Sequence, residues 1–121
     1  MSKKSKIIFN CDEVKSTMEL EEIISLITTG NKDTAEYELT GLILHNLTTG
    51  KRFLTKDQMY DLYMRNREKI SKASFYRILT RLKDRGMVVE DKETQRYQSS
   101  ILFSNTLQRL AIAWELIVLK P

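Results

Sequence analysis

The sequence predicts a mainly helical domain that carries one small β-hairpin. Glycine and proline are scarce, with four glycines and a single proline in 121 residues, and few breakers over such a length favour helices. A clear amphipathic helix spans residues 71–86, and a strand–turn–strand pattern follows it directly. A chain of this length is expected to form one domain, 1–121, that buries its own core.

The helix within residues 71–86 is the best-defined element. Ser71 is a favourable N-cap, and Gly86 can end the helix by turning left-handed. One face is apolar at helical spacing and should be buried: Phe75, Ile78, Leu79 and Leu82. The opposite face is polar and basic, without an acid before Asp84: Lys72, Ser74, Tyr76, Arg77, Thr80 and Arg81.

The segments on either side of this helix complete a recognisable order. Thr55 is expected to cap a helix from Lys56 to about Arg67, and residues 65–69 form the connecting turn. After Gly86, residues 87–90 and 96–103 read as two strands joined by the polar turn 91–95. A helix, a basic helix and a hairpin in this order are typical of a winged helix-turn-helix.

The same stretch resembles winged-helix DNA-binding domains of bacterial and archaeal transcription regulators. The run Ala73-Ser74-Phe75-Tyr76-Arg77 is similar to the recognition helix of ferric-uptake-type regulators, and the leucine and glycine spacing is shared with MarR- and PadR-like proteins. The resemblance covers about 50 residues. It implies that Tyr76 touches a base or sugar and Arg77 a phosphate or guanine. The metal-sensing part of the ferric-uptake-type proteins is not matched, so metal sensing is not carried over.

The remaining segments are expected to surround this core, which spans 34–103. Residues 1–12 read as an arm, and 13–30 as a helix capped by Ser16 or Thr17. A further helix, capped by Asp33 or Thr34, should run to about Leu47. The apolar positions expected inside it are Tyr37, Leu39, Leu42, Ile43 and Leu47.

The C-terminal helix, 105–120, is apolar around nearly its whole circumference. Asn105 and Gln108 form a capping-box pattern at its start. A helix that is apolar all round must be buried, either within the monomer or, as we expect, in a twofold homodimer together with the N-terminal helix. The residues expected at that interface are Ile23, Ile27, Leu107, Leu110, Ala111, Trp114, Ile117 and Val118.

Charge points to a polyanion as the partner. The net charge is +4, but residues 51–86 alone carry eleven Lys/Arg against four acids, which fits nucleic acid. The alternative is a solvated face that keeps the protein soluble.

The single cysteine, Cys11, and single histidine, His45, allow neither an internal disulfide nor a typical zinc site. His45 could be a pH switch or ligand, or simply a surface residue. With no cofactor signature and no membrane-spanning run, a cytoplasmic location is expected.

Together these patterns predict a double-stranded DNA-binding regulator, most simply a repressor, rather than an enzyme. The recognition helix would enter the major groove, with Lys56 on a phosphate and the hairpin tip at the adjacent minor groove or backbone. The expected DNA contacts are Lys56, Lys72, Ser74, Tyr76, Arg77, Thr80, Arg81, Lys92, Gln95 and Arg96. Asp91 and Glu93 count against contacts at the tip. The rival hypothesis is a winged helix that binds other proteins, as a module or a subunit of a larger complex.

Overall fold

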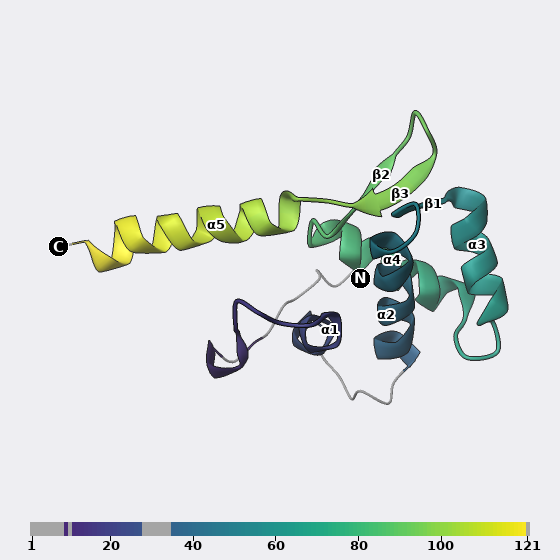
Figure 1. The fold of residues 1–121 in the computed structure, drawn as a ribbon, viewed down its shortest axis with the longest axis horizontal. Helices are drawn as coiled ribbons and strands as arrows, with labels where there is room; N and C mark the ends of the chain where they lie inside the picture. The colour runs from purple at the N-terminus through teal and green to yellow at the C-terminus, as the bar shows by residue number, and fades with distance from the viewer. Residues whose placement is uncertain (1–8, 10, 28–34, 121) are drawn as a thin grey trace.

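The chain folds as a mainly helical body with a small antiparallel sheet and one projecting helix (Figure 1). The computed structural model describes residues 9, 11–27 and 35–120. The elements are η1 (Cys11–Glu13), α1 (Leu20–Ile27), α2 (Ala35–Thr48), β1 (Phe53–Thr55), α3 (Lys56–Arg65), α4 (Lys72–Asp84), β2 (Val88–Asp91), β3 (Arg96–Ser99), α5 (Leu102–Trp114) and the π-helical turn η2 (Glu115–Leu119).

The core lies where α2, α3 and α4 meet the sheet. α2 contacts α1, α4, β1 and β3, so it is the element that the others pack around. The four apolar positions predicted on α4 are all buried, as are three of the five predicted on α2, while Tyr37 and Leu42 are half-buried. The fully buried side chains are Ile27, Leu39, Thr40, Ile43, Leu47, Met59, Phe75, Leu79 and Leu82.

The three-stranded sheet has the order β1-β3-β2, with both pairs antiparallel. The predicted hairpin is confirmed as β2 and β3, but β3 ends at Ser99 rather than at Phe103. β1 was not predicted, because a three-residue strand has no readable alternation. It exists through its pairing with β3, where Leu54 lies opposite Tyr97.

The caps predicted for α3 and α4 are confirmed. The Thr55 hydroxyl accepts a hydrogen bond from the Gln58 amide, and the Gln58 side chain accepts one from the Thr55 amide, which makes a capping box. The Ser71 hydroxyl accepts from the Ser74 amide at the start of α4. α3 ends at Arg65, two residues before the expected end.

Gly86 ends α4 with the reversal that its sequence position predicted. Its φ is +79°, its amide donates to the Lys83 carbonyl, and the Met87 amide donates to the Leu82 carbonyl, both at 3.0 Å. These two bonds make a Schellman motif, which satisfies carbonyls that the helix leaves open. The Gly86 carbonyl in turn accepts from the Phe103 amide at 2.9 Å, so the same residue anchors the start of α5.

The N-terminal helix is shorter than predicted. α1 begins at Leu20, not near Ser16 or Thr17, and the Glu22 carboxylate accepts a hydrogen bond from the Glu19 amide just before it. A glutamate therefore supplies the cap in place of the predicted hydroxyl. The predicted helix end at Gly30 and the caps at Asp33 and Thr34 lie outside the described residues.

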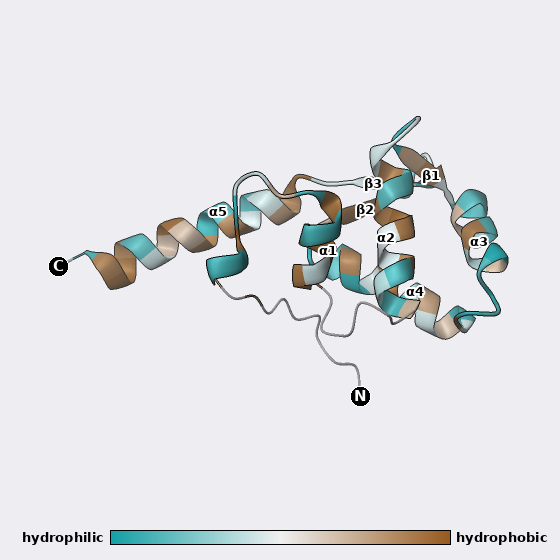
Figure 2. Cartoon of the chain, turned by 60° about the horizontal axis from the view of Figure 1, so that its bottom comes forward, coloured by the Kyte–Doolittle hydropathy of each residue, from teal (hydrophilic) through white to brown (hydrophobic). Residues whose placement is uncertain are grey.

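The C-terminal helix begins earlier than predicted, and of its side chains only Phe103 packs against the described core. α5 starts at Leu102, where the Ser100 hydroxyl accepts a hydrogen bond from the Leu102 amide at 3.1 Å, and Asn105 lies inside the helix, so the Asn105 capping box is wrong. The Ser100 amide donates to the Met87 carbonyl, and the Phe103 amide donates to the Gly86 carbonyl. These two bonds fix the chain reversal, so the helix starts three residues before the predicted start at Asn105. No residue of α5 or η2 is buried, and the helix extends away from the body (Figure 1) with apolar segments along its length (Figure 2). The described residues, 9, 11–27 and 35–120, therefore do not bury this helix.

Gly86 offers a direct test of this architecture. A Cβ at Gly86 would lie 3.0 Å from the Phe103 amide nitrogen and 3.1 Å from Leu102, in addition to the positive φ. We expect Gly86→Ala to lower the free energy of unfolding by about 2–4 kcal/mol, from left-handed strain and overpacking.

Gly50→Ala is the matched control for this substitution. Gly50 also has a positive φ, +60°, but nothing lies within 4 Å of its added Cβ. Gly50→Ala should lower the free energy of unfolding only by the left-handed backbone strain, about 1 kcal/mol. Urea unfolding followed by circular dichroism measures both, and equal losses would contradict the anchoring role of Gly86.

Candidate nucleic-acid interface

The outward face of α4 is narrower than its polar sequence indicated. Ala73, Arg77, Thr80 and Asp84 follow one another at spacings of four, three and four, and all four are exposed. They lie opposite the buried Phe75 and its neighbours, because residues at this spacing share one helix face. This stripe is the part of α4 that can enter a groove.

The flank of α4 that faces α3 carries Lys72 and Tyr76. The Lys72 ammonium lies 5.5 Å from the centre of the Tyr60 ring, a cation–π distance. Tyr76 is half-buried and packs edge-on against Phe75, with ring centres 5.4 Å apart. Burial raises the pKa of the Tyr76 hydroxyl, and Tyr60 and Tyr63 raise it further. Tyr76 is therefore partly a core residue.

The opposite flank faces α2 and is occupied by ion pairing. Arg81 forms a salt bridge with Glu36 in the first turn of α2, so its guanidinium is directed toward α2 and away from the outward stripe. Ser74 is half-buried, and its hydroxyl accepts a hydrogen bond from Ser71 at 3.0 Å. Burial lowers the pKa of the nearby Arg85 guanidinium, Glu36 raises it, and Arg81 lowers it.

One carboxylate joins the hairpin to both helices. Glu90 on β2 forms salt bridges with Lys56 at the start of α3 and with Lys83 on α4, each at 3.2 Å. The Glu90 side chain is only 16% exposed, and its hydrogen bonds with Lys83 and Lys56 hold its pKa below the ordinary value, against the opposing effect of burial. Lys56 is still 48% exposed, so it can reach a phosphate while bound to Glu90.

The hairpin tip presents an exposed lysine and an arginine held in a fixed position. Asp91 accepts hydrogen bonds from the amides of Glu93 and Thr94; Thr94 has the largest effect in lowering the pKa of the Asp91 carboxyl. The Arg96 guanidinium stacks on the Phe53 ring at 4.1 Å from its centre. The exposed polar residues of the tip are Lys92, Glu93, Thr94, Gln95 and Arg96.

The structure thus brings together only part of the predicted DNA-contact set. Arg77 and Thr80 lie on the outward stripe, with Lys72 and Lys56 beside it, and Lys92, Gln95 and Arg96 at the hairpin. Ser74, Tyr76 and Arg81 lie on the flanks. Sequence reasoning missed Ala73, although its spacing from Arg77 and Thr80 places it on their face, and it missed the aromatic supports Tyr60 and Phe53.

The predicted dimer residues fall into two groups. Ile27 is 2% exposed and belongs to the core, so it is not available to a second chain, while Ile23 is half-buried. The six residues predicted on α5 and η2 are all exposed. They are Leu107, Leu110, Ala111, Trp114, Ile117 and Val118.

Other candidate chemistry is sparse in the part of the chain that the structure describes. His45 is exposed in the last turn of α2, where its backbone carbonyl accepts hydrogen bonds from the Thr48 and Thr49 hydroxyls. Cys11 is exposed. Among residues 9, 11–27 and 35–120, no group of three or more His, Cys, Asp or Glu side chains could hold a metal ion. No helix in these ranges combines the length and apolar character needed to cross a bilayer.

Comparison with known proteins identifies the family. Residues 38–120 match an archaeal protein family. Because the match covers more than half of the sequence, the chain belongs to this archaeal family. The matched region runs from the first turn of α2 through α3, α4 and the hairpin to the end of α5 and η2. Searches of curated proteins and of solved structures returned no match.

The Glu90 salt bridges predict an acid-sensitive hairpin. The pKa of the Glu90 carboxyl is lower in the folded protein than its ordinary value of 4.5. Such a carboxyl stabilises the folded state at pH values above 4.5, and this contribution is lost as the pH falls through the lower pKa of the folded state. Glu90→Gln should therefore destabilise the protein at pH 7 and make its stability less dependent on pH in the acid range.

Glu93→Gln removes the same charge from the exposed hairpin tip and serves as the control. It should leave the acid dependence close to that of the unmodified protein. Thermal unfolding between pH 7 and pH 3 measures all three proteins. An unchanged acid dependence in Glu90→Gln would contradict the assignment of Glu90 as the residue that fastens the hairpin.

Proposed function

We propose that this protein is a winged helix-turn-helix transcriptional repressor that binds double-stranded DNA sequence-specifically as a homodimer. The observation that carries the proposal is the outward stripe of α4. It is a helix face with an exposed arginine, held rigidly by a buried opposite face and flanked by further exposed cations.

The arrangement of elements supports a winged helix. α2, β1, α3, α4, β2 and β3 follow one another in the order of that fold, and the hairpin pairs with β1 as its third strand. In this fold α4 would be the recognition helix and the β2–β3 hairpin the wing. The major groove of B-DNA is wide enough to admit one helix, and α4 is 13 residues long, or about 20 Å.

The charges around α4 divide into those that hold the fold and those that face solvent. Lys56, Lys69, Lys83 and Arg81 each form a salt bridge within the chain. The cations of the predicted DNA-contact set that are in none of these salt bridges therefore lie on the stripe, beside it and on the hairpin. They are Arg77, Lys72, Lys92 and Arg96.

The stripe has groups suited to base recognition. Arg77 can donate two hydrogen bonds to a guanine edge, and Ala73 can contact the methyl group of thymine. The Thr80 hydroxyl donates to the Tyr76 carbonyl at 3.0 Å, so in this rotamer it can only accept, which suits the amino group of adenine or cytosine. Lys72 beside the stripe suits a phosphate.

The exposed apolar surface of α5 supports self-association. Leu110 is 65% exposed, Trp114 57% and Ile117 81%, and exposed apolar surface of this extent marks interaction sites. A twofold dimer would present two α4 helices to one duplex.

The same surface also favours a second candidate function, that of a winged helix that binds a different protein. In that case α5 would bind the other protein and the basic face would not contact DNA. Light scattering combined with titration of a labelled random duplex at low salt separates the two. A monomer that does not bind DNA would favour the protein-binding function.

Arg77→Ala tests the recognition helix. Arg77 is exposed, so its removal should leave the fold intact and weaken specific duplex binding by about 1–3 kcal/mol. The target site comes from footprinting DNA upstream of the protein's own reading frame, and fluorescence anisotropy measures the affinity.

Arg109→Ala is the matched control for Arg77→Ala. It removes an equal charge from an exposed position on α5, away from the proposed recognition surface, and should leave the affinity unchanged. Unchanged binding by a folded Arg77→Ala protein would refute the recognition role of α4.

Lys92→Ala tests the hairpin as a contact to the DNA backbone. Removing one phosphate contact should weaken binding to all sequences alike and lower the slope of log affinity against log salt by about 0.9. Lys56→Ala should lower it by less, because Glu90 already offsets part of the Lys56 charge. Anisotropy titrations over a salt series on a random duplex give the slopes, and an unchanged slope for Lys92→Ala would remove the hairpin from the interface.

A further inference from the structure

The projecting helix carries two different apolar patterns along its length. Phe103, Leu107, Leu110, Trp114 and Ile117 recur at spacings of four, three, four and three. From Phe103 to Trp114, within the α-helical part, this is the average spacing of 3.5 residues that forms the seam between two helices. Ile117 follows in the π-helical turn at the tip. A second apolar stripe exists only near the tip, on the other side of the helix. It consists of Ile112 and Leu116, whereas the polar residues Asn105, Gln108 and Arg109 lie away from the seam in the first half. Leu119, in the π-helical turn η2, lines the same hollow as Leu107, Leu110 and Trp114.

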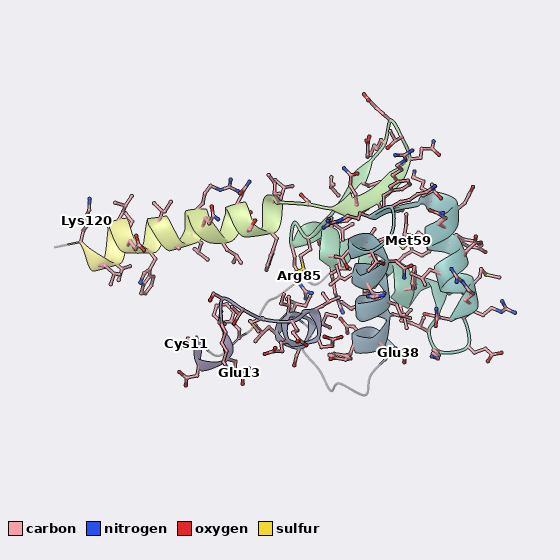
Figure 3. All side chains as sticks on the ribbon, in the orientation of Figure 1. Cys11, Glu13, Glu38, Met59, Arg85 and Lys120 are labelled. Carbon is pink, nitrogen blue, oxygen red and sulfur yellow. The ribbon has the colours of Figure 1, made fainter. Side chains whose placement is uncertain are left out.

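These two patterns need two kinds of burial. A seam needs only one partner helix, but the tip is apolar on opposite sides and must be covered on both. In Figure 3 the side chains of α5 project on both sides of the helix along its length, and Lys120 marks the tip. The part of the chain that the structure describes provides no such cover, since no residue of α5 or η2 is buried.

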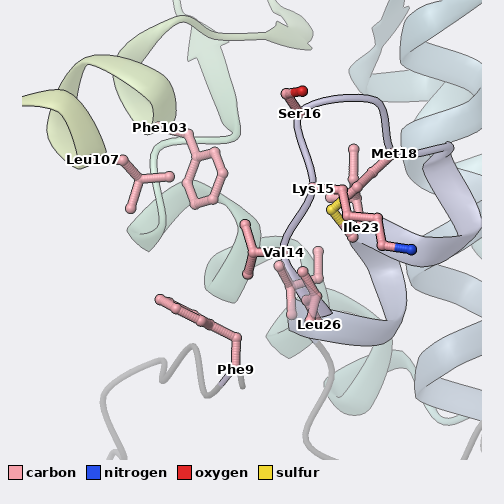
Figure 4. Close-up of a pocket in the computed structure, with 10 residues that line it drawn as sticks. Phe9, Val14, Lys15, Ser16, Met18, Ile23, Leu26, Phe103 and Leu107 are labelled. Atoms are coloured by element: carbon pink, nitrogen blue, oxygen red, sulfur yellow. The ribbon is translucent and has the colours of Figure 1, made fainter. Parts of the chain in front are cut away.

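A surface suited to the tip lies at the root of α5. A pocket of about 430 Å³ opens between the N-terminal segment and α5, and its lining is mostly apolar. Figure 4 shows Phe103 and Leu107 of α5 facing Val14 and Phe9 across it. A second hollow shares Phe9 and Leu107 and continues along α5 past Trp114 to Leu119. The two together form an apolar groove that follows the seam.

We propose that two copies of this chain pair their α5 helices antiparallel, so that the tip of each fills the root pocket of the other. The inference rests on the homodimer of the proposed function and specifies its geometry. With Leu110 facing its own counterpart, Phe103 of one chain meets Ile117 of the other. Leu116 and Leu119 then reach the pocket formed by Val14, Phe103 and Leu107 of the second chain.

The direction of pairing follows from where apolar surface needs cover. A parallel pair would bury the seam but place the two tips side by side, with the second stripes and both root pockets still open to water. An antiparallel pair covers the seam, the tips and the pockets together. Charge agrees with this direction, because Lys120 at the tip would approach the exposed acids Asp12, Glu13, Glu19 and Glu22 near the root of the second chain, a minor contribution in water.

Distances between spin labels test the direction of pairing. In a Cys11→Ser background, labels are attached through Lys120→Cys or Gln108→Cys, both at exposed positions, and measured by double electron–electron resonance without DNA. An antiparallel pair centred on Leu110 separates the two Lys120 positions by about 30 Å along the helix axis and the two Gln108 positions by only about 6 Å. Nearly equal distances at both positions would indicate a parallel pair, and no dipolar signal a monomer; either result overturns the proposal.

Substitution at the tip tests the root pocket. Leu116 lies off the seam and is 50% exposed in the single chain, so Leu116→Glu should leave the monomer folded but weaken dimerisation by at least tenfold. Gln108→Glu adds the same charge on the polar side of the first half and should have no such effect. Equal dimer dissociation constants by analytical ultracentrifugation would show that the tip is not enclosed and would overturn the proposal.

The DNA-binding part of the proposed function is measured separately. If the unsubstituted protein shows no DNA binding by fluorescence anisotropy while the label distances indicate an antiparallel pair, DNA binding alone is refuted. A parallel dimer that binds DNA would refute the antiparallel arrangement alone, and a monomer that binds DNA would refute the homodimer as well.

Discussion

The packing of α4 on α2 decides what this protein can present to a partner. Phe75, Leu79 and Leu82 are at most 2% exposed, and burying three large apolar side chains fixes the rotation of the helix about its axis. That rotation turns Ala73, Arg77 and Thr80 outward. It also places Tyr76 and Arg81 on the flanks, where Tyr76 packs against the core and Arg81 pairs with Glu36 of α2. A helix free to rotate would offer any of its polar residues, whereas this one offers a single stripe.

Salt bridges separate the cations that hold the structure together from those available to a ligand. Glu90 links the hairpin to α3 and α4 through two lysines, and Glu36 links α2 to α4 through Arg81. Each link lies at the border of the outward stripe. The formal excess of positive charge in residues 51–86 therefore overstates the charge that DNA would meet, and the positions of the acids matter as much as the number of lysines and arginines.

The sequence predicted those parts of the fold that depend on local patterns. The caps at Thr55 and Ser71, the reversal at Gly86 and the hairpin follow from residues within a few positions of one another. β1 and the start of α5 could not be found in this way, because β1 depends on pairing with β3 and α5 on a bond to Gly86. The candidate site divides similarly. Spacing alone places Arg77 and Thr80 together, but the ion pair of Arg81 with a glutamate 45 positions earlier requires the tertiary structure.

The start of the projecting helix α5 is bonded to the end of α4, so the direction of α5 depends on the residue that ends α4. α5 begins where Gly86 ends α4, since the Gly86 carbonyl binds the Phe103 amide at 2.9 Å. The direction of α5 is thereby coupled to the end of the proposed recognition helix. If two α5 helices pair about Leu110, the distance between the two α4 helices is set by residues 86–110 of each chain and not by a flexible linker. The spacing of the two half-sites on DNA would then be a property of the α4–α5 junction, and a change at Gly86 would alter it without touching either the DNA contacts or the centre of the dimer seam at Leu110.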